Sequence, residues 1–294
     1  MFRLEAAACW RYICHSQSAA WSSHYFVMRH GLLGMPPFQK KGRSGFGVSF
    51  FYGYLQKVKI TFMKKTDFLV IALVVLFLAP FFLSDTVYAG YTAWNRANAM
   101  SMAFLKFAIL ATFGEMLGLR IKTGHYWEKG FGVVPRMVVW GVFGMWIAAA
   151  MGIFRMGVPA FLDTFTVFDG ISGAMKGGFT GMKLLGAFCI SLMMNTSFAP
   201  VFMTMHKILD NQIARHEGRF SSLTSRIPME EFISSLNWKV QWGFVFKKTI
   251  PIFWIPAHTL TFLLPTDMQV LFAALCSVIL GLFLSIAAVK SKNN

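Results

Sequence analysis

Residues 268–289 read MQVLFAALCSVILGLFLSIAAV and contain no charged side chain. A helix rises about 1.5 Å per residue, so about 20 apolar residues cross a hydrocarbon core ~30 Å thick. Charged residues stand at both edges of this stretch, Asp267 before it and Lys290 after it. The stretch therefore predicts a membrane-spanning helix close to the C-terminus.

Further apolar blocks of similar length lie upstream, over residues 68–83, 99–119, 133–154, 179–205 and 238–264. The last of these is irregular, because Pro251 and Pro256 each remove a backbone donor and tend to kink a helix. The composition agrees, since 56% of the 294 residues are hydrophobic and the mean hydropathy is +0.55, more than a soluble domain usually carries. The predicted fold class is all-α, a polytopic transmembrane helix bundle of about six spans.

The basic residues lie mostly between the apolar blocks. A formal net charge of +16 could indicate nucleic-acid binding, but this placement favours the positive-inside rule of membrane proteins. One set of loops and ends holds Lys64, Lys65, Arg120, Lys122, Lys129, Arg136, Lys207, Arg215, Arg219, Arg226, Lys290 and Lys292, and the alternate set holds Arg96, Arg155 and Lys176. With six spans, both termini are predicted to be cytoplasmic. The predicted partner is the lipid bilayer, and no nucleic acid is expected.

The chain divides into four predicted segments: an extension over residues 1–62, a first span and outer loop over 63–98, a helix bundle over 99–289 and a basic tail over 290–294. The acid-poor extension resembles a mitochondrial presequence. We favour a second interpretation, in which it lies upstream of a bacterial start at Met63. The bacterial inner membrane is then the expected location, with the mitochondrial or peroxisomal membrane as the alternative. Val87-Tyr88-Ala89 resembles a cleavage site, so a signal peptide is the alternative to an uncleaved first span.

Small residues recur at intervals of four in three blocks. Such stripes let helix backbones approach closely in lipid. The stripes are Gly114 and Gly118; Gly144, Ala148 and Gly152; and Ala273, Ser277, Gly281 and Ser285. We interpret them as packing seams, either within the chain or between copies in a homo-oligomer, and a pore lined by small residues is the functional alternative.

Polar residues inside the apolar blocks are the predicted places of solute contact, because polar groups are costly in lipid. Lys106 and Glu115 are nine residues apart and so cannot pair; each either reaches the interface or faces a pore. Asn195 begins a polar run before Pro200, which predicts a kinked polar pocket. His258 is either a structural residue or a ligand. The pore or solute candidates are Lys106, Glu115, Asn195, Thr196, Ser197, Pro200 and His258, and the predicted helix kinks are Pro200, Pro251 and Pro256.

Motifs for catalysis or metal binding are not found. The sequence contains no GxSxG, HExxH or P-loop motif and no GxGxxG in a strand-to-helix context. The four cysteines are Cys9, Cys14, Cys189 and Cys276, with neither a CxxC pair nor metal-ligand spacing. We therefore expect no catalytic residue, no cofactor and no metal.

Three stretches carry a resemblance to a known family: LATFGE over residues 110–115, Phe198-Ala199-Pro200, and the run from Pro256 through Phe262 to Pro265. With them, residues 99–286 resemble the Mpv-seventeen / peroxisomal-membrane-protein-twenty-two family of small integral membrane proteins. The resemblance implies four spans, to which the block at 68–83 is an addition. The chain departs from the family at Met194 and Asn195, where the family has Asp and Gln, and at Gln269, where it has Arg. It departs also in spacing, since Trp254 precedes Pro256 by two positions rather than one and the distance from Pro256 to Phe262 is shorter.

Members of that family are regarded as channel-like proteins of peroxisomal, inner-mitochondrial or vacuolar membranes. The expected function is thus channel-like, passive permeation of small solutes. One alternative is a structural or assembly protein that acts through helix–helix contacts. The other is a membrane-embedded enzyme.

Overall fold

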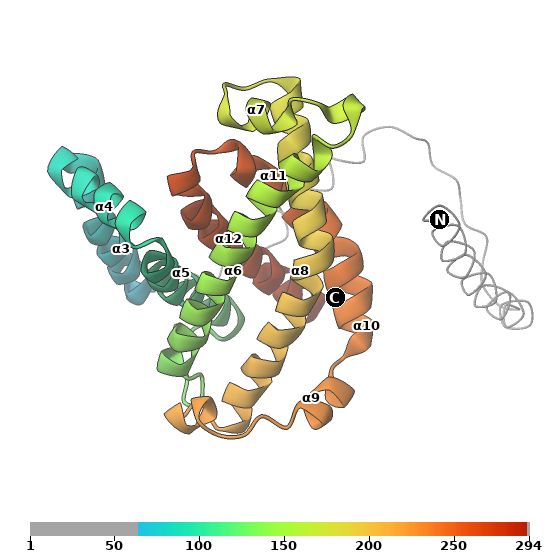
Figure 1. Ribbon diagram of the computed structural model, residues 1–294. Coiled ribbons are helices and arrows are strands. Elements are labelled where there is room, and N and C mark those ends of the chain that lie inside the picture. Colours follow the sequence, from blue (N-terminus) through green and yellow to red (C-terminus); the bar gives the residue numbers. More distant parts are fainter. Residues whose placement is uncertain (1–63, 293–294) are drawn as a thin grey trace, which may run out of the picture. The chain divides into compact units, whose positions relative to one another are not determined.

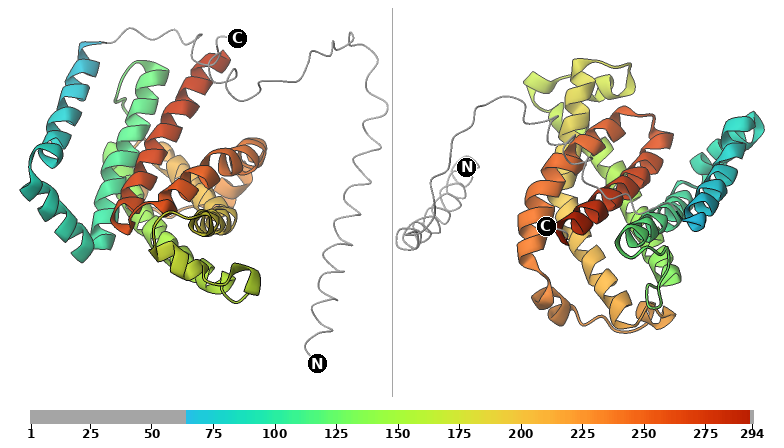
Figure 2. Two further views of the ribbon diagram at one scale, coloured as in Figure 1. Left: turned by 90° about the horizontal axis from the view of Figure 1, so that it is seen from above. Right: turned by 180° about the vertical axis from the view of Figure 1, so that it is seen from behind.

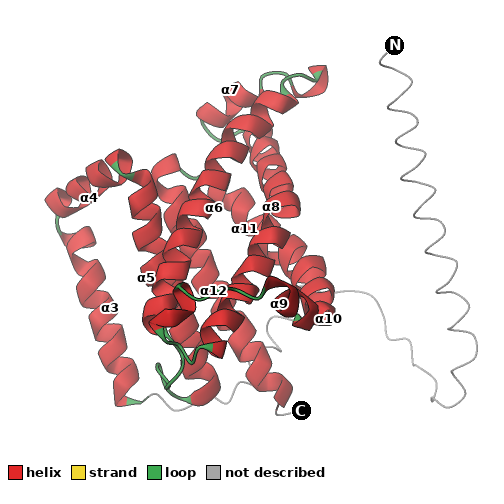
Figure 3. Cartoon of the chain, turned by 60° about the horizontal axis from the view of Figure 1, so that its bottom comes forward, coloured by secondary structure: helices red, strands yellow, loops and turns green. Residues whose placement is uncertain are grey.

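The computed structural model describes residues 64–292, and the regular structure in this range is helical throughout (Figure 1, Figure 3), as predicted. The predicted extension 1–62, the predicted start at Met63 and the last two residues of the tail lie outside the described residues. The elements are α3 (Lys65–Leu83), α4 (Asp85–Ala97), α5 (Ala99–Thr123), α6 (Val133–Leu162), η1 (Thr166–Phe168), α7 (Ile171–Lys176), α8 (Gly181–Arg215), η2 (Phe220–Leu223), α9 (Met229–Ser235), α10 (Trp238–Val240), η3 (Gln241–Trp254), α11 (Ile255–Leu263) and α12 (Thr266–Lys292).

Five of these helices are long and apolar enough to cross a membrane: α3, α5, α6, α8 and the Thr266–Phe283 part of α12. The chain is therefore a multi-pass membrane protein. The irregular block at 238–264 forms α10, η3 and α11, which follow one another without a break from Trp238 to Leu263. Each of the three is by itself shorter than a membrane span.

The three predicted kink prolines lie in different settings. Pro200 lies inside α8, which continues past it to Arg215. Pro256 lies in the first turn of α11, where its missing N–H costs little. Pro251 lies inside η3, a stretch of π-helix, at whose end the N–H of Ile255 bonds the carbonyl of Ile250. Of the three prolines, only Pro251 lies where the helix departs from α-helical geometry. In an α-helix its pyrrolidine ring would clash with the carbonyl four residues before it.

Five helices form a closed ring. α5 packs against α6 and α12, α8 packs against α6 and α11, and α11 contacts α12. Figure 2 shows these helices grouped together in both views. The hydrophobic core lies between them and includes the buried Phe107 of α5, Ile190 of α8 and Phe262 of α11. The predicted bundle thus has a continuous interior in which polar groups can be enclosed.

The predicted small-residue stripes of α5 and α12 form a seam within the chain. A Cβ added at Gly114 would lie 3.0 Å from the Cα of Val278, and one added at Gly118 would lie 2.7 Å from the Oγ of Ser285. The seam brings Gly281 close to the Gly114 carbonyl as well. Ala273, one turn before Ser277 in α12, is buried as well. Small residues here allow the two backbones to approach closely.

The stripe of α6 divides into two parts. A Cβ at Gly144 would lie 2.6 Å from the carbonyl oxygen of Ala103, so Gly144 belongs to the contact between α5 and α6. Gly152 has nothing within 4 Å of its added Cβ, and it lines a cavity together with Ala148. The predicted packing seam along α6 therefore lies within the chain at Gly144, whereas at Gly152 contact between copies and a small-residue pore lining stay predictions.

α3 and α4 form an arm outside the ring (Figure 1, Figure 2). None of the apolar residues of α3 is buried. The first turn of α3 is nevertheless fixed to the bundle by Asp67. This carboxylate accepts bonds of 2.8 and 2.5 Å from Arg120 and one of 2.9 Å from Tyr126. Burial, and then the hydrogen bond to Asp67, raises the pKa of the Tyr126 phenol, so its hydroxyl stays a neutral donor.

The helices alternate in direction, which gives the bundle two distinct ends. At one end the Asp67–Arg120 pair places the start of α3 beside the end of α5, and Gly132, before α6, packs against Gly218, after α8. We call this the basic end and the other, which carries α7, the far end. α12 begins at the far end and ends at the basic end, so the start of α3 and the end of α12 lie at the same end in Figure 3.

Candidate functional site

Three cavities follow one another between the two ends of the bundle. The basic-end cavity, about 510 Å³, lies between α5, α6, α8, η3 and α12. The central cavity, about 40 Å³, lies between α5, α6, α8, α11 and α12. The far-end cavity, about 290 Å³, lies between α4, α5, α6 and α12. Since one water needs about 10–15 Å³ of such space, the central cavity has room for only a few waters.

A charged cluster forms one wall of the basic-end cavity. Arg136 of α6 holds Glu115 of α5 at 2.5 Å and Asp210 of α8 at 2.7 Å. Glu115 also accepts a 3.0 Å bond from Trp140 and lies 3.3 Å from Nε2 of His206. The cluster therefore joins three helices and keeps two carboxylates compensated inside the bundle.

Two side chains of η3 that line this cavity carry buried donors for which the described part of the chain offers no hydrogen-bond partner. They are the amide nitrogen Nε2 of Gln241 and the indole nitrogen Nε1 of Trp254. A buried donor without a partner costs about 1–3 kcal/mol, so native proteins usually satisfy such groups with water or a ligand. Both nitrogens have almost no accessible surface, so neither opens onto the cavity in this conformation.

The central cavity is lined by Asn195 and His258, which lie on α8 and α11. The Asn195 amide is 3.0 Å from Nδ1 of His258 and donates a 2.8 Å bond to the Ser191 carbonyl. Ser191 in turn donates to the Ile255 carbonyl at 2.7 Å. Asn195 and His258 are buried, so this polar strip both links two helices and supplies the polar side of the cavity.

The basic-end and central cavities adjoin each other, because Phe202, Met203, Trp254 and Ser277 line both of them. The far-end cavity shares no lining residue with the central one. On α5, however, Lys106 of the far-end cavity adjoins Phe107 of the central cavity, and on α6 Ala148 adjoins Ile147. The two cavities thus lie against adjacent residues of α5 and α6, and the buried Phe107 and Met151 each line one of them.

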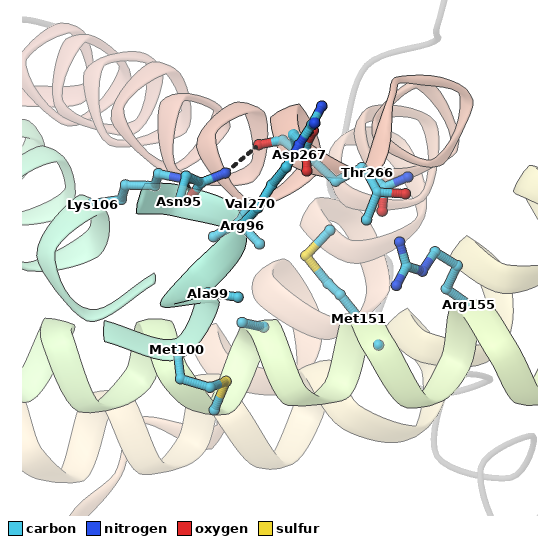
Figure 4. A pocket seen from close by; sticks show the side chains of 13 residues that line it. Asn95, Arg96, Ala99, Met100, Lys106, Met151, Arg155, Thr266, Asp267 and Val270 are labelled. Carbon is cyan, nitrogen blue, oxygen red and sulfur yellow. Dashed lines mark hydrogen bonds and ion pairs between the residues drawn. The ribbon is translucent and has the colours of Figure 1, made fainter. Parts of the chain in front are cut away.

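The far-end cavity contains a buried cation. Lys106 is 8% exposed, and its Nζ donates a 2.5 Å bond to Oδ1 of Asn95 on α4. Arg96 pairs with Asp267 at 2.7 Å above the same cavity, and Arg155 of α6 lines its other side (Figure 4). The α4 arm is therefore tied to α5 and α12 around this cavity.

The structure brings some of the predicted pore candidates to the cavities and leaves others outside. Lys106 lines the far-end cavity, Glu115 the basic-end cavity, and Asn195 and His258 the central cavity. Thr196 and Ser197 are exposed on the outer face of α8, where their hydroxyls bond carbonyls of their own helix. Pro200 is half-buried and lines none of the three cavities.

Several site residues were not singled out in the sequence. Arg136, Trp140, His206, Asp210 and Asn95 all belong to the cavity walls. One signal was present, because Arg136 and Trp140, like His206 and Asp210, are spaced four apart and so share a helix face.

Comparison with known proteins adds no further identification: no family model, no curated protein and no solved structure matches this chain. Among residues 64–292, no group of three or more His, Cys, Asp or Glu side chains could hold a metal ion. The candidate site is therefore defined by the cavities and their polar walls alone.

Proposed function

We propose that this chain is a channel-like membrane protein through which small solutes pass passively along the three cavities. The observation that carries the proposal is the row of cavities, each with polar residues in its wall and two of them adjoining, along a helix bundle whose outer faces are apolar. The resemblance to the Mpv-seventeen family supports the same class of function. In this proposal η3 and α11 together form the sixth span, the termini are cytoplasmic and the membrane is a bacterial inner membrane.

The separation between the far-end and central cavities fits a gated pathway. The far-end and central cavities lie against adjacent residues of α5 and α6, so a small shift of either helix would join them. Permeation would then be limited by the central cavity, which has the smallest volume of the three.

Ser277 gives the sharpest test, because it lines both the central and the basic-end cavity. In Ser277→Leu a larger apolar side chain occupies this narrow region. We expect glycerol efflux from proteoliposomes to fall to the rate of protein-free liposomes. Thermal unfolding of the same preparation checks the fold, since overpacking typically costs about 1–3 kcal/mol.

The matched control is Ser197→Leu. Ser197, like Ser277, bonds the carbonyl four residues before it, but it is exposed on the outer face of α8. Glycerol efflux through this variant should equal that of the unaltered protein. Equal efflux through both variants, with both folded, would remove the cavities from the pathway.

A structural or assembly protein is the second candidate, and the exposure of α3 favours it. Phe68, Leu76 and Phe82 are all more than half exposed in the single chain, so this helix has a large face for lipid or another membrane helix. If the unaltered protein gives no glycerol efflux above that of protein-free liposomes, the assembly role replaces the channel-like one.

A further inference from the structure

The charges around the far-end cavity do not balance. Its lining includes three cationic side chains, Arg96, Lys106 and Arg155, and one carboxylate, Asp267. That carboxylate is already engaged with Arg96 at 2.7 Å. Within residues 64–292, neither Lys106 nor Arg155 has an ion-pair partner. The lining therefore has two cationic side chains whose charge no carboxylate of the cavity compensates.

Lys106 is the more unusual of these two cations because it is buried. An ammonium group has three N–H donors, and Lys106 uses one of them for Asn95. The ring of Tyr91 lies 5.5 Å away and adds a cation–π contact. Removing a charge from water is costly unless the charge is paired. The ammonium therefore leaves donors and charge available to a group in the adjoining cavity.

Arg155 supplies the second cation from another helix. It is half-buried on α6, one turn beyond Met151 and on the cavity side that Lys106 does not occupy (Figure 4). A guanidinium presents a planar fork of donors that matches the oxygens of a carboxylate or phosphate. Cations from two helices around about 290 Å³ of space form a site in which a small anion can be held from two sides.

We propose that the far-end cavity binds the oxyanion group of a small solute, a carboxylate or a phosphate, between Lys106 and Arg155, and that the pathway thereby selects anions over cations. This inference rests on the proposed function and names its solute class. The basic-end cavity agrees with it. There the cations Lys122, Arg136 and Lys207 outnumber the carboxylates Glu115 and Asp210.

Selectivity is tested by measuring the efflux of lactate, choline and glycerol from proteoliposomes. The lactate rate and the choline rate are each divided by the glycerol rate, so that a general change in permeability cancels. We expect lactate to exceed choline. In the double variant Lys106→Met with Arg155→Gln, the lactate-to-choline ratio should fall by about tenfold, because charge–charge interactions at such a site change equilibria by this order or more. Lys183→Met is the matched control. Lys183 is a half-buried lysine in the first turn of α8, and it lines none of the three cavities.

Binding is measured independently of transport, in detergent without phospholipid. Millimolar inorganic phosphate should raise the melting temperature of the unaltered protein and of Lys183→Met, but not that of the double variant, since a ligand that binds only the folded state stabilises it. Equal stabilisation of all three proteins would overturn the inference. So would stabilisation by a phospholipid headgroup without any by phosphate, because the site would then hold lipid rather than solute.

The two proposals fail in distinguishable ways. Absence of glycerol efflux contradicts the channel-like function, while the phosphate measurement still decides whether the site exists. Glycerol efflux with equal lactate and choline ratios, or with a preference that the double variant retains, leaves the channel-like function standing and overturns the anion site.

Discussion

Arg136 connects more elements than any other side chain discussed above. Its Nε donates to the Phe131 carbonyl at 2.8 Å, and its two terminal nitrogens reach Glu115 and Asp210. The guanidinium thereby fixes the start of α6 to α5 and α8 at once. Arginine suits this place because its donors form a rigid fork, which a lysine cannot reproduce.

Arg136→Met should destabilise the protein, because it leaves the carboxylates of Glu115 and Asp210 without their main partner. Loss of one partner of a fully buried pair costs about 3–5 kcal/mol. These two carboxylate side chains keep 21% and 24% exposure, so we expect about 2 kcal/mol, read as a lower midpoint of chemical unfolding in detergent.

Arg215→Met is the control for this measurement. Arg215 pairs with Glu231 at 2.8 Å, but the two side chains are 50% and 58% exposed. Exposed pairs contribute only about 0–1 kcal/mol, so the midpoint should change little. Similar losses in both variants would show that the Arg136 cluster adds no more than a surface ion pair.

At this scale, the sequence predicted which polar residues line the cavities only where one polar residue stands alone in an apolar block. Lys106 and Glu115 stand alone in an apolar block, and both line cavities. The run Asn195, Thr196 and Ser197 was treated as one pocket, although each residue turns the helix by about 100°. Asn195 therefore faces the interior while its two neighbours face outward. Arg136 was counted as a loop charge, because burial by partners from α5 and α8 is a tertiary effect.

At the scale of elements, the contact between α5 and α12 is the part that small residues determine most directly. The four-residue stripes were visible in the sequence, and the structure places Gly114 and Gly118 against Val278 and Ser285. The geometry of η3 was less accessible. Proline spacing predicted irregularity in that block, but the choice of π-helical turns depends on how the segment packs on α8 and α11.

Gly114→Val should weaken the α5–α12 contact. The new Cβ would lie 3.0 Å from the Cα of Val278, a backbone atom that cannot move without shifting α12. Overpacking of this kind costs about 1–3 kcal/mol, which should appear as a lower melting temperature in detergent.

Gly157→Val is the matched control, since Gly157 lies on α6 with nothing within 4 Å of its added Cβ. Valine has a higher helix propensity than glycine, so this variant should melt at the same temperature or slightly above. Equal destabilisation of both variants would mean that the effect comes from the valine itself rather than from the seam.

At the scale of the whole molecule, the arm of α3 and α4 distinguishes this chain from a simple ring. It is attached at both ends of α5, through Asp67 with Arg120 at the basic end and through Asn95 with Lys106 at the far end. The apolar block of α3 was evident from the sequence. Its attachment was not, because Asp67 and Arg120 are far apart in sequence and each resembles an ordinary flanking charge.

The number of crossings decides the orientation of the C-terminus. Five helices meet the length and hydropathy of a span, and an odd number would place the loop after α8 and the C-terminus on opposite sides. In the structure α10, η3 and α11 run from the basic end to the far end, where Asp267 of α12 meets Arg96. α12 therefore returns to the basic end.

Reporter fusions at Lys292 and in the 207–237 loop should report the same side, and a fusion at Gly177 the opposite one. If the fusions at Lys292 and in the 207–237 loop report opposite sides, η3 and α11 do not cross the membrane. The ring of helices around the cavities would then have a gap on the side of α11, where the cavities would face lipid.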